Sequence, residues 1–327
     1  MFSNYSHLGL GGIPLQRTDV ETVKTLIKAM ADDGFHVVDS AKGYTISEEW
    51  LGEALVGLRD NFFLCTKSMA RDKETMAKDI DDSLIKFKTE RIDLYQLHNI
   101  SKPEEYERIM APDGAMAALL EAKTAGKINH IGITSHSIDL IDKLLDDCPF
   151  ETIQLPYNMI EEKAKATFKK AHQKGIKTLA MKPLCGGVLA EYPSAVSFFR
   201  DEDCCDVVLI GMADDEEYNA NKAAFNREYT TEDKKKAEEL KEELGDRFCR
   251  RCGYCLPCPI GINIPMIWLI NGYIHRYGLR DWAMIRYDQE KTASSECLAC
   301  GQCEERCPYH LPIIPKMKEV AEEMSKR

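Results

Sequence analysis

Short apolar runs rich in β-branched residues alternate along the chain with longer amphipathic stretches. The runs lie at residues 8–11, 36–39, 62–67, 92–98, 128–134, 152–157, 177–182 and 207–211. Helical periodicity separates them, for example at residues 20–33, 48–58, 73–87 and 114–125. Asp39 and Lys67, which end the second and third runs, are 28 residues apart, and Lys67 and His98 are 31 apart. A strand–helix–strand unit needs about 30 residues, so the pattern predicts an α/β fold, a (β/α)8 barrel.

A doubly wound open sheet is the alternative fold. It calls for a Gly-x-Gly-x-x-Gly turn after the first strand, where a dinucleotide would bind. Residues 9–14 read Gly-Leu-Gly-Gly-Ile-Pro, which is not that motif. The barrel is therefore the preferred prediction.

A very polar stretch follows the eighth run. Residues 231–244 mix acidic and basic side chains at helical spacing, and Gly245 follows. This composition is typical of an exposed helix that ends at a glycine. We expect a barrel over residues 1–230, a charged helical connector over residues 231–246 and a second domain over residues 247–327.

Four polar residues lie at or just after the carboxyl ends of predicted strands. They are Asp39, Tyr44, Lys67 and His98. In such barrels the catalytic groups come from this end, whereas any one of these residues alone is more often structural. Together they suit proton delivery: an ammonium at Lys67, held by Asp39, would lower the pKa of the Tyr44 phenol. His98 could then hydrogen-bond a carbonyl oxygen on which negative charge develops.

The segments around these four residues resemble the aldo/keto reductase superfamily. The likeness is carried by residues 34–44, 47–48, 66–67 and 93–98, and it continues through residues 126–136, 154–158, 182–187 and 211–212. It covers roughly residues 1–225. The superfamily's Asp, Tyr, Lys and His tetrad maps onto Asp39, Tyr44, Lys67 and His98. The resemblance implies hydride transfer to an aldehyde or ketone, with Tyr44 as proton donor.

The resemblance also implies a nicotinamide cofactor, NADPH or NADH, across the carboxyl end of the barrel. Ser135, His136 and Gln154 would approach the carboxamide, and the segment after the seventh strand would follow the pyrophosphate. The complete expected set is Ser135, His136, Gln154, Tyr157, Met181, Lys182, Pro183, Leu184, Gly187, Gly211 and Met212.

Two positions depart from the superfamily pattern. Met181 stands where an aromatic ring often stacks on the nicotinamide, and a thioether offers less planar contact. Residues 214–217 read Asp-Asp-Glu-Glu where NADPH-preferring members carry a basic residue for the 2′-phosphate. Carboxylates suit a ribose 2′-hydroxyl better than a phosphate, so the choice between NADH and NADPH stays open.

Eight of the thirteen cysteines lie between residues 249 and 307. They form two runs: Cys249, Cys252, Cys255 and Cys258, then Cys297, Cys300, Cys303 and Cys307. The second run matches the bacterial ferredoxin pattern C-x₂-C-x₂-C-x₃-C-P, and the first is one residue shorter before its last cysteine. The two runs predict two [4Fe–4S] clusters. Structural zinc is the alternative, although zinc sites favour pairs of cysteines separated by loops.

The fourth cysteine of each ferredoxin run ligates the other cluster. By that rule Cys307 joins the cysteines at 249, 252 and 255, and Cys258 joins those at 297, 300 and 303. The 38 residues between the runs include a helical pattern, which favours a mainly α-helical ferredoxin-like domain. The whole chain thus resembles aldo/keto reductase-like proteins with a C-terminal 4Fe-4S domain.

The net charge of −11 and the absence of a basic stripe argue against a nucleic-acid partner. The most apolar run, residues 262–274, is broken by Asn263, Pro265 and Asn271, so we expect no membrane span. The first residues lack the pattern of a secretion signal, and we expect a cytoplasmic protein.

Three functions fit these features. The first is an NAD(P)H-dependent reductase of a small-molecule carbonyl, with clusters that are structural or exchange electrons with a redox partner protein. The second is an iron–sulfur electron-transfer protein whose barrel is a docking scaffold. The third is a flavin-assisted redox enzyme. The intact tetrad favours the first, because a scaffold would not need it.

Overall fold

The computed structural model describes residues 1–2, 5–190, 192–244, 248–250, 253–277 and 280–326. Contacts within the chain divide it into two compact units, Met1–Lys235 and Lys236–Arg327. The division falls inside helix α10 (Thr231–Leu244), in the segment expected to connect two domains. No helix in the described ranges is both long enough and apolar enough to cross a membrane.

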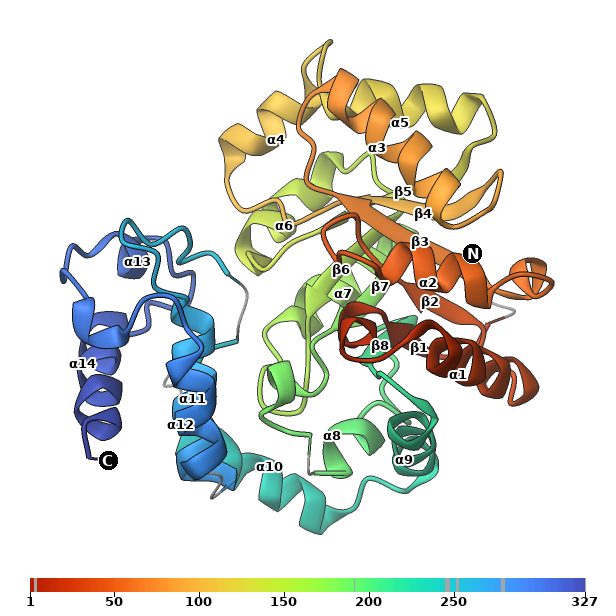
Figure 1. The fold of residues 1–327 in the computed structure, drawn as a ribbon. Coiled ribbons are helices and arrows are strands. Elements are labelled where there is room, and N and C mark those ends of the chain that lie inside the picture. Colours follow the sequence, from red (N-terminus) through yellow and green to blue (C-terminus); the bar gives the residue numbers. More distant parts are fainter. Residues whose placement is uncertain (3–4, 191, 245–247, 251–252, 278–279, 327) are drawn as a thin grey trace. The chain divides into compact units, whose positions relative to one another are not determined.

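The first unit is a closed barrel of eight parallel strands, which confirms the predicted fold (Figure 1). Each strand pairs with the next along the chain, and the last pairs with the first through the register Leu8–Val208 to Gly11–Gly211. The strands are β1 (Leu8–Gly11), β2 (Val37–Asp39), β3 (Phe63–Ser68), β4 (Ile92–Leu97), β5 (Ile128–Thr134), β6 (Thr152–Pro156), β7 (Lys177–Met181) and β8 (Val207–Gly211).

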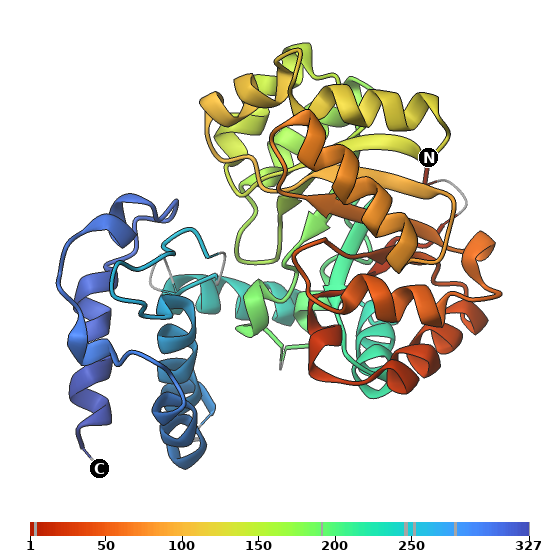
Figure 2. The same cartoon turned by 45° about the horizontal axis from the view of Figure 1, so that its top comes forward.

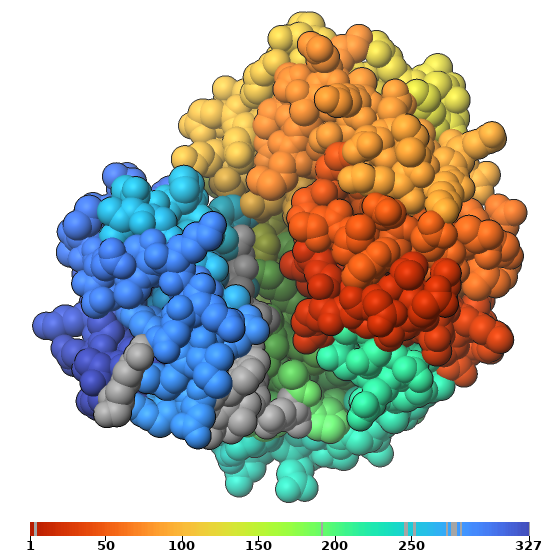
Figure 3. Space-filling model, in the orientation of Figure 1, coloured from red at the N-terminus to blue at the C-terminus, as the bar shows by residue number. Residues whose placement is uncertain are grey.

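Helices surround the barrel, as the two ribbon views show (Figures 1 and 2). They are α1 (Val20–Asp32), α2 (Ser47–Ala54), α3 (Lys73–Lys86), α4 (Pro103–Met110), α5 (Ala115–Thr124), α6 (Ile138–Leu144), α7 (Ala164–Gln173), α8 (Ser194–Ser197) and α9 (Asp215–Asn226). Helix α1 illustrates why they form: the Asp19 side chain caps its first turn by accepting from the Thr22 amide at 2.9 Å. The apolar side chains of α1 at positions 23, 26, 27 and 30 are buried at helical spacing. The side chains of α1, α2 and α3 cover the strands from one side (Figure 3).

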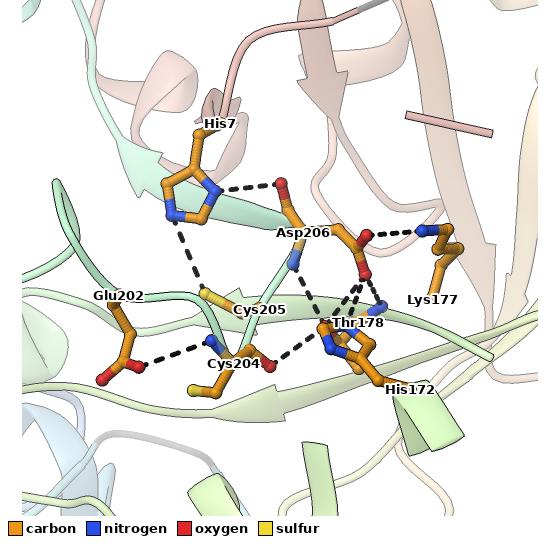
Figure 4. A network of polar contacts seen from close by, with 8 residues as sticks. All are labelled: His7, His172, Lys177, Thr178, Glu202, Cys204, Cys205 and Asp206. Carbon is orange, nitrogen blue, oxygen red and sulfur yellow. Dashed lines mark hydrogen bonds and ion pairs between the residues drawn. The ribbon is translucent and has the colours of Figure 1, made fainter. Parts of the chain in front are cut away.

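A polar network closes the amino end of the barrel, opposite the candidate site (Figure 4). The Asp206 carboxylate, just before β8, accepts hydrogen bonds from Lys177 Nζ and the Thr178 amide, each at 2.8 Å, and lies 2.8 Å from His172 Nε2. The backbone carbonyl of Asp206 is 3.0 Å from His7 Nδ1, before β1. Burial works against the carboxylate, but these donors together hold the pKa of Asp206 below its ordinary value. The network ties β7, β8 and the segment before β1 together.

The second unit is mainly helical, as predicted, with α11 (Ile264–Tyr277), α12 (Arg280–Asp288), α13 (Gln302–Glu305) and α14 (Ile313–Met324). Helix α11 packs against α12 and α14. Ile267, Ile270, Met317 and Val320 belong to the core of this unit, in which several cysteines are also included.

Gly52 provides a test of barrel packing. It lies in α2, where a Cβ atom would stand 2.1 Å from the Lys86 carbonyl oxygen and 2.8 Å from the Phe87 Cα. Alanine normally stabilises a helix interior relative to glycine by about 1 kcal/mol. Here the contact is with backbone that cannot yield, so we expect Gly52→Ala to lower the free energy of unfolding by about 1–3 kcal/mol or more.

Urea unfolding followed by circular dichroism measures this change. Gly43→Ala is the matched control, because a Cβ at that position would have no atom within 4 Å, and its stability should change little. A Gly52→Ala protein as stable as the wild type would contradict the packing of α2 on the end of α3.

Candidate active site

The four predicted residues meet at the carboxyl end of the barrel. Asp39 ends β2, Tyr44 lies in the loop after β2, Lys67 lies in β3 and His98 follows β4. Lys67 Nζ is 2.5 Å from Asp39 Oδ2 and 5.1 Å from the centre of the Tyr44 ring. The rings of Tyr44 and His98 lie edge to face with their centres 6.1 Å apart. One small volume therefore holds a phenol, an ammonium, a carboxylate and an imidazole.

The ion pair of Lys67 and Asp39 is almost fully buried, with side-chain exposures of 2% and 5%. Lys67 also donates to the backbone carbonyl of Ser40 at 2.6 Å. Burial disfavours the ammonium and by itself would lower the pKa of Lys67. Asp39 and Tyr44 act in the opposite direction, and the pKa of Lys67 stands above its ordinary value. Burial raises the pKa of Asp39 in spite of Lys67. We assign the charged pair near neutral pH, because Lys67 has two acceptors that stabilise its proton.

The pKa of Tyr44 corrects one expectation from the sequence. Lys67 favours the phenolate, as expected, yet burial of the phenol oxygen is the larger effect and Asp39 adds to it, so the pKa of Tyr44 is raised rather than lowered. The sequence showed the charges but not how deeply the oxygen is enclosed. Tyr44 therefore keeps its proton at neutral pH, as a proton donor must.

His98 is held as a neutral imidazole. Burial, together with the cations of Lys67 and Arg71, lowers its pKa to about 3. Its Nδ1 atom is buried and, among the described residues, has no hydrogen-bond partner. A buried ring nitrogen of this kind is costly unless a bound molecule satisfies it.

Sequence reasoning missed Gln96, which lies two residues before His98 on the inward face of β4. Its Nε2 donates to Gln154 Oε1 at 2.8 Å and lies 3.5 Å from Asp39 Oδ1. Gln96 thus links Gln154, expected at the carboxamide, to the carboxylate that holds Lys67. The available signal was an amide side chain between two apolar-flanked positions near the carboxyl end of a strand, two residues before His98.

Asn99 was missed as well. It follows His98 with a left-handed backbone (φ 60°), and its amide nitrogen donates to Thr134 Oγ1 at 2.8 Å. Its side-chain Oδ1 is buried and, in the described part of the chain, unsatisfied. Asn99 therefore offers an acceptor beside His98. The signal in the sequence was an asparagine directly after His98, since this residue type tolerates a positive φ.

Ser135 and His136 follow β5 directly. The Ser135 hydroxyl donates to the Ile100 carbonyl at 2.5 Å and accepts from the Ser137 amide. Burial, then the positive charge of Lys182, lowers the pKa of His136 well below its ordinary value. His136 is thus a neutral ring close to Lys182.

The loop after β7 contains an unusual series of left-handed residues. Lys182, Cys185, Gly186 and Gly187 have φ values of 58°, 51°, 68° and 96°. Asn158 Nδ2 holds the loop by donating to the Lys182 carbonyl at 3.2 Å. Backbone amides in such turns form concave sites for anions, which fits the pyrophosphate expected along residues 182–187. Met181 ends β7 and Pro183 and Leu184 lie in the same loop.

The structure does not bring Tyr157 to this set. Its ring is fully buried among Phe168, Phe198 and Phe199, and its hydroxyl donates to Glu202 Oε2 at 2.6 Å. These contacts direct the ring into the layer between strands and helices. Tyr157 therefore packs inside the barrel unit, apart from the four polar residues, and its expected contact with the cofactor stays a prediction.

The side chain of Met212 is also fully buried, in the hydrophobic core of the barrel. A Cβ on Gly211 would come within 2.8 Å of Pro14 Cγ. Met212 can therefore offer a nucleotide only its backbone, as glycine does, and the cofactor contact expected of both residues stays a prediction.

Two side chains of the acidic run after β8, those of Asp214 and Glu217, accept hydrogen bonds from backbone amides. The Asp214 side chain caps α9 by accepting from the Glu217 amide at 2.8 Å. Glu217 accepts from the Ala213 amide at 2.8 Å. Its two carboxylate oxygens also accept from Arg17 Nη2, at 3.0 and 3.1 Å. Arg17 is thus a cation beside the run, neutralised by Glu217.

The cysteines of the second unit line two separate pockets. The first pocket, as we call it, is lined by Cys249, Cys255 and Cys307. The second pocket is lined by Cys258, Cys297, Cys300 and Cys303. The fourth cysteine of each run thus lies with the other run, the grouping that the ferredoxin rule gives; Cys252 lies outside the described residues.

The spacing of these cysteines bears on what they could hold. In the described residues no three His, Cys, Asp or Glu side chains are close enough to hold a single metal ion. Four sulfurs around one zinc ion stand about 3.8 Å apart, given Zn–S bonds of about 2.3 Å. Sulfurs around a four-iron cube stand farther apart, because the cube lies between them. Among the described residues, three cysteines line one pocket and four line the other, against the four thiolates that a [4Fe–4S] cluster takes.

Comparison with known proteins adds to this geometry. The sequence profile of the aldo/keto reductase family matches residues 7–195. The chain belongs to the aldo/keto reductase family. A profile described as a 4Fe-4S dicluster domain matches residues 248–312, in the second unit. This family member therefore carries a 4Fe-4S dicluster domain after its barrel.

Individual relatives match the barrel. The chain is 31% identical to aldo-keto reductase YhdN of Bacillus subtilis over 209 residues, 59% of this chain and 61% of that protein. It is 27% identical to 6-dehydroglucose reductase of Novosphingobium aromaticivorans over 221 residues, 59% of this chain and 67% of that protein. The chain thus spans about three-fifths of the length of YhdN.

A solved structure shows the same fold. The aldo-keto reductase AKR11C1 from Bacillus halodurans superposes with a TM-score of 0.60 at 22% identity, over 72% of this chain and 92% of that one.

The lowered pKa of His98 predicts a neutral ring at physiological pH. A group with a pKa of about 3 is charged only below that value, so His98 should show no titration between pH 5 and 8 by NMR. Lys67→Met should raise the pKa of His98, because one of the cations that lower it is removed. A wild-type titration midpoint near the ordinary value of about 6.5 would contradict the burial of this ring.

Proposed function

We propose that the barrel reduces a small aldehyde or ketone with NADPH or NADH, and that Tyr44 is the proton donor. The observation that carries this proposal is the meeting of the Tyr44 phenol with a buried ammonium and a neutral imidazole at one end of the barrel. A protonated acid beside a neutral hydrogen-bond donor suits a carbonyl oxygen that gains negative charge.

The chemistry is a two-electron reduction. When bound, the nicotinamide supplies a hydride to the carbonyl carbon. Tyr44 transfers its hydroxyl proton to the carbonyl oxygen as the C=O π bond becomes a C–H and an O–H bond. The Tyr44 phenolate that remains is stabilised by Lys67, until a proton from solvent restores the phenol. His98 donates a hydrogen bond to the same oxygen and stays neutral throughout.

The residues around the site fit a nicotinamide nucleotide. The unsatisfied atoms His98 Nδ1 and Asn99 Oδ1 give two polar partners, and the left-handed loop after β7 gives backbone amides. We propose Ser135, His136 and Gln154 at the carboxamide, and the loop at the pyrophosphate, with Met181 at the face of the ring. Lys182 would add positive charge near the phosphates.

The carbonyl oxygen proposed to lie between Tyr44 and His98 also bears on the class of substrate. The relatives include methylglyoxal reductase DkgA of Escherichia coli, 28% identical over 144 residues, and 6-dehydroglucose reductase, both named for small carbonyl compounds. We propose a substrate of that chemical class, with one carbonyl oxygen between Tyr44 and His98.

We further propose two [4Fe–4S] clusters in the second unit. The first pocket would use its three cysteines together with Cys252, and the second pocket would use its four. Such clusters supply one-electron exchange, and Cys300 is exposed where a redox partner protein could approach. The grouping of the cysteines in two pockets supports this assignment.

Tyr44→Phe tests the proton donor. The substitution removes one oxygen, so the kcat for carbonyl reduction should fall by about 100- to 10,000-fold while nucleotide affinity changes little. 4-Nitrobenzaldehyde is a suitable probe, with NADPH and NADH tested separately. Tyr5→Phe, at the amino end of the barrel, is the matched control and should keep full activity. Near-normal turnover by Tyr44→Phe would remove Tyr44 from this role.

Substitutions in the acidic run, residues 214–217, test the choice between NADH and NADPH. We expect NADH to bind at least as tightly as NADPH, because residues 214–217 repel a 2′-phosphate. Glu217→Gln should free Arg17 and improve NADPH relative to NADH by roughly two- to fivefold, the range of an exposed ion pair of about 0.5–1 kcal/mol. Glu216→Gln makes the same charge change without releasing Arg17 and should have less effect.

Dissociation constants for both nucleotides at one ionic strength decide the matter. A tenfold or greater preference of the wild type for NADPH, about 1.4 kcal/mol, would show that another cation holds the phosphate.

The cluster ligands are tested by iron and sulfide analysis of anaerobically purified protein. The wild type should contain about eight of each per chain, for two cubes of four. Cys307→Ala should lose the cluster of the first pocket and Cys258→Ala that of the second, about half the iron each. Cys148→Ala, in the barrel unit, is the control. A colourless protein with stoichiometric zinc would refute the clusters.

A further inference from the structure

Among the described residues, a buried arginine lines the first pocket and none lines the second. Arg250 is only 5% exposed, and it shares the pocket with Cys249, Cys255 and Cys307. Its guanidinium carbon lies 4.3 Å from the centre of the Phe248 ring and 4.0 Å from that of Tyr309. Arg250 Nη1 also donates to the Phe248 carbonyl at 3.3 Å.

This arrangement fixes a full positive charge beside the cysteines. A guanidinium between two aromatic faces is held by cation–π attraction and has little freedom to turn outward. Arginine does not lose its proton in proteins, so the charge is present at every ordinary pH. The first pocket therefore has a permanent cation in a place largely closed to water.

The second pocket has a different lining. Apart from its four cysteines, the described residues that line it are apolar, namely Pro259, Ile260, Ile262, Ile264, Leu298, Ile314 and Met317. Leu298 is 67% exposed and Cys300 is exposed, so this pocket lies at the surface of the unit. The two pockets thus differ both in charge and in access to water.

The charge difference acts on electron affinity. A [4Fe–4S] group takes up one electron and no proton, so its reduction adds one negative charge to a pocket that already holds four thiolates. Net charge, hydrogen bonds to sulfur and solvent exposure set the potential of such a group. A nearby cation favours the reduced, more negative form. Exposure of Cys300 favours the same form in the second pocket, but a full charge in a low-dielectric pocket acts more strongly than the exposure of one ligand to water.

We propose that Arg250 raises the reduction potential of the first pocket's cluster above that of the second. This inference rests on the proposed clusters and goes beyond them: the first electron from a one-electron donor is held in the first pocket, while the exposed second pocket is the side that a donor protein reaches. Arg250 acts on the cluster's potential without being one of its ligands.

Redox titration of the full-length protein with dithionite, followed by electron paramagnetic resonance, tests this role. In Arg250→Gln the higher of the two midpoint potentials should fall, so that the ratio of reduced to oxidised cluster at a fixed potential drops about tenfold, a shift of 59 mV for one electron. The lower potential should stay unchanged. Arg250→Lys should retain most of the wild-type value, because the charge is kept. Lys318→Gln removes an exposed charge on α14 and should move neither potential.

An unchanged higher potential in an Arg250→Gln protein that contains both clusters would overturn the proposal, as would a fall in the lower potential alone. The wild type gives a second test, which holds even if Arg250→Gln loses its cluster. Proton NMR during stepwise reduction should show paramagnetic shifts of the Phe248 and Tyr309 rings with the first electron. Shifts that come only with the second electron would place the first electron in the second pocket and refute the role of Arg250.

These outcomes are separate from failure of the proposed function. A wild-type protein without iron and sulfide would refute the clusters themselves. A protein with the expected potentials but no carbonyl reduction would refute the barrel chemistry and leave the role of Arg250 intact.

Discussion

The ion pair of Lys67 and Asp39 constrains the whole carboxyl end of the barrel. Removing two charges from water costs several kcal/mol per ion, and only close pairing and further hydrogen bonds offset that cost. The 2.5 Å contact and the bond from Lys67 to the Ser40 carbonyl supply this compensation. The ammonium thus fixed lies beside Tyr44 and helps to keep His98 neutral. Burial and the Asp39 carboxylate keep Tyr44 protonated against this cation, whereas burial and the same cation keep His98 neutral.

The reactions proposed for the two units involve different numbers of electrons. A nicotinamide transfers two electrons as a hydride, whereas each [4Fe–4S] cluster transfers one. Direct exchange between the proposed reactions would need a carrier that converts one to the other, such as a flavin. The proposed barrel chemistry therefore needs no electron from the second unit, and the proposed clusters would exchange electrons separately from it. The matches of two separate family profiles to residues 7–195 and 248–312 agree with this division.

Local patterns in the sequence were enough to predict the barrel and the positions of its four polar residues. Strand spacing fixes which residues reach the carboxyl end, so Lys67 and His98 could be placed together. Properties that depend on enclosure could not be predicted: the pKa of Tyr44 rises because of atoms brought in by distant segments. Tyr157 fits the family pattern but packs among aromatic rings from α7 and from the two residues that follow α8. The role of Gln96 could not be predicted, because it depends on its hydrogen bond to Gln154 across the barrel.

Transfer of deuterium from the nicotinamide tests the central claim most directly. The anaerobically purified, cluster-containing protein would be mixed with NADPH or NADH deuterated at both C4 positions and with 4-nitrobenzaldehyde, and the alcohol analysed by mass spectrometry and NMR. The account predicts one deuterium on the carbinol carbon of each product molecule, with the iron–sulfur absorbance unchanged during turnover. An alcohol without deuterium at that carbon, or bleaching of the clusters by the nucleotide in step with product, would contradict direct hydride transfer in the barrel.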